Sequence, residues 1–217
     1  MSTYHHGNLR SELIATATEL ARRSGPDGVA LREVARQAGV SHNAAYRHFS
    51  DRDALLAEVA AVAMAQLELS MRERTARIAE PDPGRRARLR LSETGRAYVD
   101  FALAEPGLFK VAFASMSTLA TATAPEVTPA PERSAAAVEG WEHAGPYGVL
   151  GHVLDELVEA GQLSPQRREG AELTCWSAVH GFAALHQTGP LRAVEPEERR
   201  RALEGLLATI EHGLLDA

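Results

Sequence analysis

The sequence has a single cysteine, few aromatic residues and no long uninterrupted apolar run. With one thiol the chain cannot form a disulfide within itself, so we expect a reducing compartment. Cys175 lies between Thr174 and Trp176 in an apolar stretch, and we interpret it as a small buried hydrophobic side chain. A redox or catalytic thiol is the alternative.

Secretion signals, membrane spans and catalytic motifs are also missing. The N-terminal stretch MSTYHHGNLR lacks the apolar core of a signal peptide, and no later segment reaches the uninterrupted apolar length that crosses a bilayer. We therefore expect a cytoplasmic protein without a membrane partner. The chain contains no HExxH, no Cys-x-x-Cys and no Gly-Lys-Ser/Thr phosphate loop. These absences argue against an enzyme, and we predict no cofactor and no metal site.

The net charge of −6 argues against binding nucleic acid through a global positive field. Seven arginines and seven acidic residues within positions 1–60 make that part neutral, so the remainder of the chain carries the deficit. DNA contact in the N-terminal part would then depend on a locally basic face formed by Arg10, Arg32, Arg47 and Arg52.

Helical periodicity dominates the chain, since alanine and leucine are frequent and alternating β-branched runs are absent. We predict an all-α protein. Asn8 can cap a first helix, which Gly25 and Pro26 end. Ser50, with Asp53 three residues later, predicts the start of a long fourth helix that stops before Pro81.

Further helices follow from the apolar spacing, and they are expected from residue 85 to 104, from 108 to 116, from 146 to 158, from about 165 to 185 and after Pro196. The stretch 117–133 is rich in Ser, Thr, Ala and Pro and is expected to be a mobile loop. A short helical segment is expected at 135–144.

Residues 31–55, LREVARQAGVSHNAAYRHFSDRDAL, predict two short helices joined by a tight turn. Gly39 supplies the permissive corner, and Ser41 stands where the second helix needs an N-cap oxygen. That second helix, roughly residues 42–49, would turn His42, Asn43 and Arg47 outward while Ala45 and Phe49 face the core.

This stretch resembles the N-terminal DNA-binding domain of the TetR family of bacterial transcription regulators. The resemblance extends from about residue 8 to 56 and depends on LREVARQAGVS, then YRHF, then RDAL, in the family's order and spacing. Beyond residue 60 it thins, although Trp176, His180 and Gly181 are similar to the pattern of one subgroup. His180 is interpreted as a hydrogen-bonded core histidine, with an interface or ligand contact as alternatives.

The resemblance implies that Tyr46 and His48 bind phosphates, that Arg52 anchors the start of the fourth helix to the DNA backbone, and that residues 42–44 face base edges. Side-chain chemistry agrees, because Asn43 can pair with adenine, Arg47 can reach guanine or a phosphate, and Ala44 offers a methyl to thymine. The candidate DNA-binding residues are Arg32, Ser41, His42, Asn43, Ala44, Tyr46, Arg47, His48 and Arg52.

Two positions depart from the family pattern. Ala30 sits where a Thr or Ser usually caps the second helix and touches phosphate, and Ala45 replaces a larger core residue. One phosphate contact and some packing are therefore expected to be lost.

The resemblance further implies a homodimeric regulator that binds a double-stranded, near-palindromic DNA operator, usually as a repressor, and is released by a small-molecule effector. We expect a DNA-binding domain at residues 1–56, a ligand-binding and dimerisation domain at 57–217, and a dimer interface at 173–185 and 203–214. The candidate ligand-binding residues are the aromatics Tyr98, Phe101, Phe109, Phe113, Trp141 and Trp176.

Two other functions remain open from the sequence. One is a TetR-like protein that organises chromosomes or acts in cell division without an inducer. The other is a helical small-molecule binder or enzyme whose helix-turn-helix no longer meets DNA.

Overall fold

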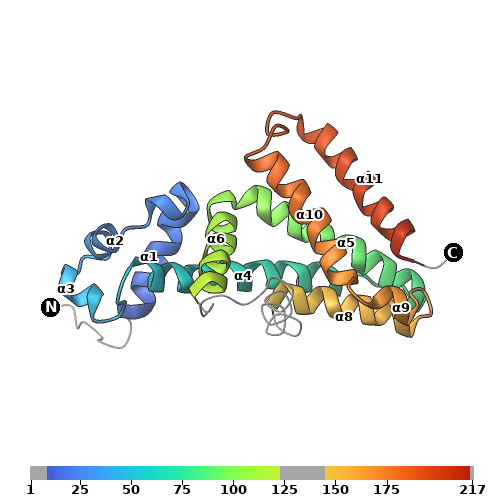
Figure 1. Cartoon of the computed structure of the whole chain (residues 1–217), viewed down its shortest axis with the longest axis horizontal. Coiled ribbons are helices and arrows are strands. Elements are labelled where there is room, and N and C mark those ends of the chain that lie inside the picture. The colour runs from blue at the N-terminus through green and yellow to red at the C-terminus, as the bar shows by residue number, and fades with distance from the viewer. Residues whose placement is uncertain (1–8, 123–144, 216–217) are drawn as a thin grey trace. The chain divides into compact units, whose positions relative to one another are not determined.

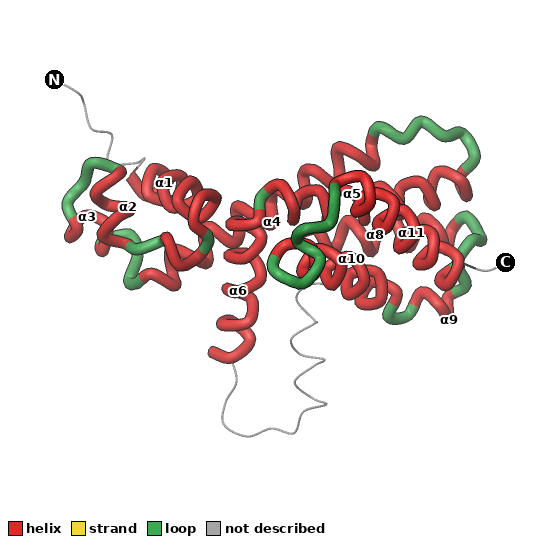
Figure 2. The backbone as a smooth tube through the Cα atoms, turned by 90° about the horizontal axis from the view of Figure 1, so that it is seen from above, coloured by secondary structure: helices red, strands yellow, loops and turns green. Residues whose placement is uncertain are grey.

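The computed structural model describes residues 9–122 and 145–215, and it describes side chains in these ranges except at 115–122. The described residues form ten α-helices and one short 3-10 helix, and they include no strand (Figure 2). The prediction of an all-α protein is confirmed.

The chain divides into two compact units. The first unit holds residues 9–64 and 105–122, and the second holds 65–104 and 145–215. This division differs from the single boundary that we expect between residues 56 and 57, because the segment after residue 104 returns to the first unit.

The first unit contains the predicted helix-turn-helix, in the order shown by the colours of Figure 1. Its elements are α1 (Leu9–Ser24), η1 (Pro26–Gly28), α2 (Leu31–Gln37), α3 (His42–Tyr46), the first part of α4 (Arg52–Ala76) and α6 (Pro106–Ala122). Leu13, Ala17 and Leu20 of α1 are buried, as their spacing predicts.

The turn between α2 and α3 has the predicted chemistry. Gly39 adopts φ 70°, and the backbone N–H of Ala44 donates to Oγ of Ser41 over 3.2 Å. The second helix is shorter than predicted, since α3 ends at Tyr46 rather than at Phe49. Phe49 is nevertheless core, with 3% of its surface exposed.

The start of α4 corrects one prediction. The cap is Asp51, whose Oδ1 accepts a hydrogen bond of 2.7 Å from the backbone N–H of Ala54, while Oγ of Ser50 donates to Oδ2 of the same carboxylate. These hydrogen bonds lower the pKa of Asp51. The Asp51 carboxylate lies one residue nearer the helix than Ser50, and its negative charge is more favourable at the positive end of the helix dipole. The pattern of Ser50 and Asp53 therefore indicates the wrong capping residue.

Helix α6 packs directly on α1 within the first unit. A Cβ built on Gly107 would lie 2.1 Å from the carbonyl oxygen of Ala21, so only glycine permits this approach. The guanidinium of Arg22 also forms an ion pair with Glu105, just before α6 begins. Because α6 continues to Ala122, the loop predicted from Ser117 starts too early; the rest of that loop and the segment at 135–144 lie outside the described residues.

The second unit is built around α5 (Pro83–Ala104), which packs against α8, α10 and α11. The other elements are the last part of α4, α8 (Gly145–Glu159), α9 (Pro165–Arg168), α10 (Ala171–Gln187) and α11 (Pro196–Leu214). Buried leucines of α5 and α8 meet Cys175 of α10 in one core. The helices predicted at 85–104, at 146–158 and after Pro196 are present, with ends shifted by at most a few residues. The helix predicted from about 165 to 185 is instead two helices, α9 and α10, because Gly170 between them adopts a left-handed φ of 72°.

Helix α4 is more apolar than the sequence analysis predicts. One stretch of it is long and apolar enough, by length and composition alone, to cross a membrane. Its buried residues Leu55, Val59, Ala63, Leu67 and Met71 recur every four residues, which is the spacing of a helix packed along one side. This pattern favours a core helix.

Candidate nucleic-acid interface and internal cavity

The outer surface of α3 presents polar side chains to solvent. Asn43, Arg47 and His48 are exposed, as predicted, and Tyr46 is 46% exposed. Ala44 is partly buried. The Asn43 amide on α3, with the Arg47 guanidinium and the His48 imidazole just after the helix ends, forms a set of donors and acceptors suited to base edges and phosphates.

His42 lies differently from its neighbours on α3. Its ring packs edge-on against Tyr46 with 4.5 Å between ring centroids, and its Nε2 is buried without a hydrogen-bond partner among the described residues. In this conformation the imidazole contacts the protein rather than facing outward. Its contact with base edges stays a prediction that requires the side chain to turn.

The basic face is smaller than the four arginines expected from the sequence. Arg10 pairs with Glu58 over 2.6 Å and lies above the Phe49 ring, 5.3 Å from its centroid. Arg32 and Arg47 are exposed and make no ion pair within the described part of the chain. They are the arginines of that face whose charge is not already matched.

Arg52 holds the first unit together. Its Nε donates to the carbonyl of Val29 over 2.7 Å, and one terminal nitrogen donates to the carbonyl of Pro26 over 2.6 Å. These bonds tie the start of α4 to the segment that leads into α2. The adjacent Ala30 is the N-cap of α2 and provides no side-chain hydrogen bond, as predicted. Arg52 therefore has a structural role, and its contact with the DNA backbone stays a prediction.

A small apolar cavity lies within the second unit, and its volume is about 20 Å³. This is close to the space that one water molecule needs. Its lining comes from five helices and consists of Met71, Leu91, Ser92, Thr94, Gly95, Tyr98, Leu150, Cys175, Trp176, Val179, Leu207 and Ile210.

Tyr98 and Trp176 are the predicted ligand-binding aromatics that meet at this cavity. Their rings pack edge to face with centroids 4.9 Å apart, and Tyr147 lies 5.4 Å from the Trp176 ring. Phe101 does not line the cavity. Phe109 and Phe113 pack on each other in α6, which belongs to the first unit, and Trp141 lies outside the described residues.

The aliphatic residues of the lining carry no signal in the sequence that sets them apart. Leu91, Val179 and Leu207 have the ordinary spacing of core residues, which does not distinguish a cavity wall from solid core. Gly95 offered a signal, since a glycine inside an apolar helical pattern often marks a close approach. A Cβ on Gly95 would lie 2.5 Å from Cδ2 of Leu207.

Burial keeps the titratable groups in and beside the cavity uncharged. Oη of Tyr98 lies 2.8 Å from Nδ1 of His180, within hydrogen-bonding distance. Burial raises the pKa of Tyr98, raises the pKa of the Cys175 thiol to about 11, and lowers the pKa of His180. At neutral pH the site therefore presents uncharged groups, and Cys175 is the buried thiol that the sequence predicts rather than an activated nucleophile.

We predict that Arg52→Ala lowers the free energy of unfolding by about 1–2 kcal/mol, because two hydrogen bonds from a charged donor are lost. Arg47→Ala, which removes an exposed guanidinium on α3, is the matched control and should change it by less than about 0.5 kcal/mol. Urea denaturation measures both values. Equal values for the two variants would contradict the structural role of Arg52.

We also predict a pH dependence of stability from His180. Because burial lowers its pKa in the folded state, the unfolded chain takes up the proton first as the pH falls below about 6.5. The Tm should therefore fall between pH 7 and pH 5, and His180→Gln should reduce that fall. His152→Gln, at a side chain that is 76% exposed, is the control. Identical pH profiles for His180→Gln and the unmodified protein would refute the assignment.

Two family models match the chain. Residues 13–59 match bacterial regulatory proteins of the tetR family, and residues 91–210, more than half of the chain, match the tetracyclin repressor-like C-terminal domain. No curated protein matches the chain.

Solved structures show the same fold. A protein of unknown function from Rhodococcus sp. RHA1 is 30% identical, with all of both chains covered and a TM-score of 0.69. A TetR family transcription regulator from Marinobacter aquaeolei VT8 is 15% identical, with 97% of each chain covered and a TM-score of 0.62. Another, from Pectobacterium atrosepticum, is 18% identical, with 99% of each covered and a TM-score of 0.63. The chain belongs to the TetR family of bacterial transcription regulators.

Proposed function

We propose that this DNA-binding regulator is a homodimeric repressor that a small apolar effector releases from a near-palindromic operator. The observation that carries the proposal is the presence of two sites in separate units: exposed base-reading chemistry on α3 in the first, and an apolar cavity with few polar groups in the second. A regulator that responds to a ligand needs two such distinct sites.

Sequence reading by α3 would depend on Asn43, Arg47 and Ala44. The Asn43 amide can form two hydrogen bonds to adenine, the Arg47 guanidinium can bind guanine or a phosphate, and the methyl of Ala44 can contact thymine. Tyr46 and His48 would bind phosphates beside them and set the register of the helix on the duplex. The exposure of all but Ala44 supports these roles.

Dimerisation would use α10 and α11. Leu173 and Leu185 of α10 are 64% and 45% exposed, so both offer apolar surface that a second copy could cover. Gly181 of α10 and Gly205 of α11 have no atom within 4 Å of a built Cβ, so a second helix can approach closely there. Two helices from each copy would form a four-helix interface, with the two α3 helices about 34 Å apart in successive major grooves.

The effector would be compact and mostly apolar. Ligand sites usually exceed 300 Å³, so the cavity of about 20 Å³ must open before an effector fits. An effector that binds only the opened form shifts the population toward it by the difference between its affinities for the two forms. Opened dimers would hold the α3 helices at the wrong separation for the operator.

The closed cavity favours a second candidate, a TetR-like protein that organises chromosomes or acts in cell division without an inducer. Genome-wide occupancy separates the two. A local regulator should occupy a few promoters, whereas an organising protein should occupy many dispersed sites.

We predict that the chain selects a two-fold repeated sequence from a randomised duplex library. In fluorescence anisotropy titrations, Asn43→Ala should lose discrimination at one base position by a factor of about 10 or more. Arg47→Ala should either do the same or weaken all sequences uniformly with a shallower salt dependence. Arg192→Ala, at an exposed arginine in the second unit, is the control. An unchanged base preference in Asn43→Ala would refute its reading role.

We predict a dimer of the 23.3 kDa chain by size exclusion with light scattering. Gly181→Gln and Gly205→Gln place larger side chains on the proposed contact faces and should shift the protein toward the monomer. Lys110→Gln, at an exposed side chain of α6, is the control. Gly39 also lies outside these faces, but its positive φ makes a substitution there unsuitable as a control. A monomer at micromolar concentration without any substitution would defeat the proposed dimer.

A further inference from the structure

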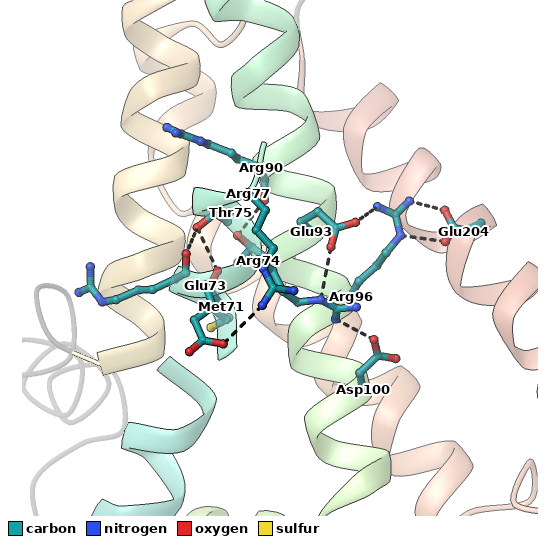
Figure 3. A network of polar contacts seen from close by, with 12 residues as sticks. Met71, Glu73, Arg74, Thr75, Arg77, Arg90, Glu93, Arg96, Asp100 and Glu204 are labelled. Atoms are coloured by element: carbon teal, nitrogen blue, oxygen red, sulfur yellow. Dashed lines mark hydrogen bonds and ion pairs between the residues drawn. The ribbon is translucent and has the colours of Figure 1, made fainter. Parts of the chain in front are cut away.

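A chain of ion pairs crosses the second unit from α4 to α5 and on to α11 (Figure 3). Arg74 of α4 contacts Asp100 over 2.7 Å and Glu93 over 3.5 Å, both on α5. Glu93 also accepts a hydrogen bond of 2.8 Å from Arg96. Arg96 in turn holds both carboxylate oxygens of Glu204 on α11, through its Nε over 2.8 Å and through a terminal nitrogen.

The last of these pairs joins the two helices that face each other across the cavity. Arg96 follows Gly95 on α5, and Glu204 precedes Leu207 on α11 by about one helical turn. Gly95 and Leu207 both line the cavity and lie so close that a Cβ added to Gly95 would require the Leu207 side chain to shift. The Arg96 and Glu204 pair therefore links α5 to α11 beside the cavity.

Helix α11 buries few residues within its own chain. Its buried residues are Leu203, Leu207 and Leu214, whereas α5 buries nine residues and α8 seven. In Figure 1, α11 lies at the edge of the second unit beside α10. An occupant larger than one water needs α5 and α11 to separate where Gly95 meets Leu207.

We propose that Arg96 and Glu204, supported by Glu93 and Arg74, form an ionic latch that keeps α11 against α5 and so controls entry of the effector to the cavity. The proposal deepens the proposed function and rests on it for the identity of the occupant. The latch itself is a property of the unliganded protein: its release lets α5 and α11 separate and opens the cavity.

The electrostatics suit a latch that opens and recloses. The side chains of Arg96 and Glu204 are 27% and 42% exposed, so water and salt reach the pair. Hydrogen bonding to Arg96 holds the pKa of Glu204 below its usual range, so the carboxylate is charged at neutral pH. Partly exposed pairs are worth little each, and shared partners in a network increase their effect.

Cys175 reports the state of the latch. It is the only cysteine of the chain, is 5% exposed and lines the cavity. Its burial and raised pKa make the thiol slow to react in the closed form. The rate at which a disulfide reagent such as 5,5′-dithiobis(2-nitrobenzoate) modifies the native full-length protein therefore measures how often the cavity opens.

We predict that Glu204→Gln raises the rate of Cys175 modification by about two- to fivefold, which is within the range that loss of one such pair allows. Glu197→Gln is the matched control, because Glu197 also pairs with an arginine on α11, Arg200, but within the same helix. It should leave the rate unchanged. Added salt should speed modification of the unmodified protein and of Glu197→Gln, and should have little effect on Glu204→Gln.

Equal modification rates in Glu204→Gln and the unmodified protein would overturn the latch. So would a Glu204→Gln rate that matches the rate of global unfolding, measured in parallel by denaturant jumps, since the substitution would then act on overall stability. The assay needs neither DNA nor effector. An unchanged rate in a chain that still binds its selected duplex refutes the latch alone, and a chain that binds no duplex refutes the proposed function alone.

Discussion

Burial of the apolar side of α5 is the constraint on which the second unit depends. Tyr98, Val99 and Ala102 of this helix have no exposed surface, and α8, α10 and α11 all pack against it. Because the helix is surrounded, its small residue Gly95 decides how closely α11 approaches. The cavity, the Tyr98 and His180 contact and the ion pairs to α4 and α11 are all consequences of which neighbour meets which turn of α5.

The positive charge available to DNA depends on which arginines already have partners within the protein, more than on the number of arginines. The first unit has enough arginines to suggest a broad basic face, yet Arg10 pairs with Glu58, and Arg52 donates to two backbone carbonyls and lies 3.7 Å from the Asp53 carboxylate. What remains for DNA is concentrated near α3 and α2. In an acidic protein this arrangement limits non-specific attraction to DNA and leaves discrimination to a few side chains.

Local signals in the sequence were sufficient for the helices and the turn, because Gly39, Ser41 and the spacing of Leu13, Ala17 and Leu20 act over one or two helical turns. The sites that depend on distant contacts were not accessible in the same way. Arg96 and Glu204 are 108 positions apart in the sequence. Helix α6 belongs to the first unit although all of α5, which belongs to the second, precedes it in the chain. Of the aromatic candidates, Tyr98 and Trp176 line the cavity, whereas Phe109 and Phe113 belong to the first unit, and aromatic composition alone does not distinguish these places.

The close approach of Gly107 to the carbonyl oxygens of α1 has a consequence for the modularity of the protein. Helix α6 covers part of α1, so the DNA-binding unit is made of two stretches of chain, with α5 between them. A fragment that ends near residue 64 would expose the surface that α6 covers. The N-terminal segment alone is therefore not sufficient to transfer the DNA-binding unit to another protein. A chimera that exchanges this unit between relatives has to include α6 as well.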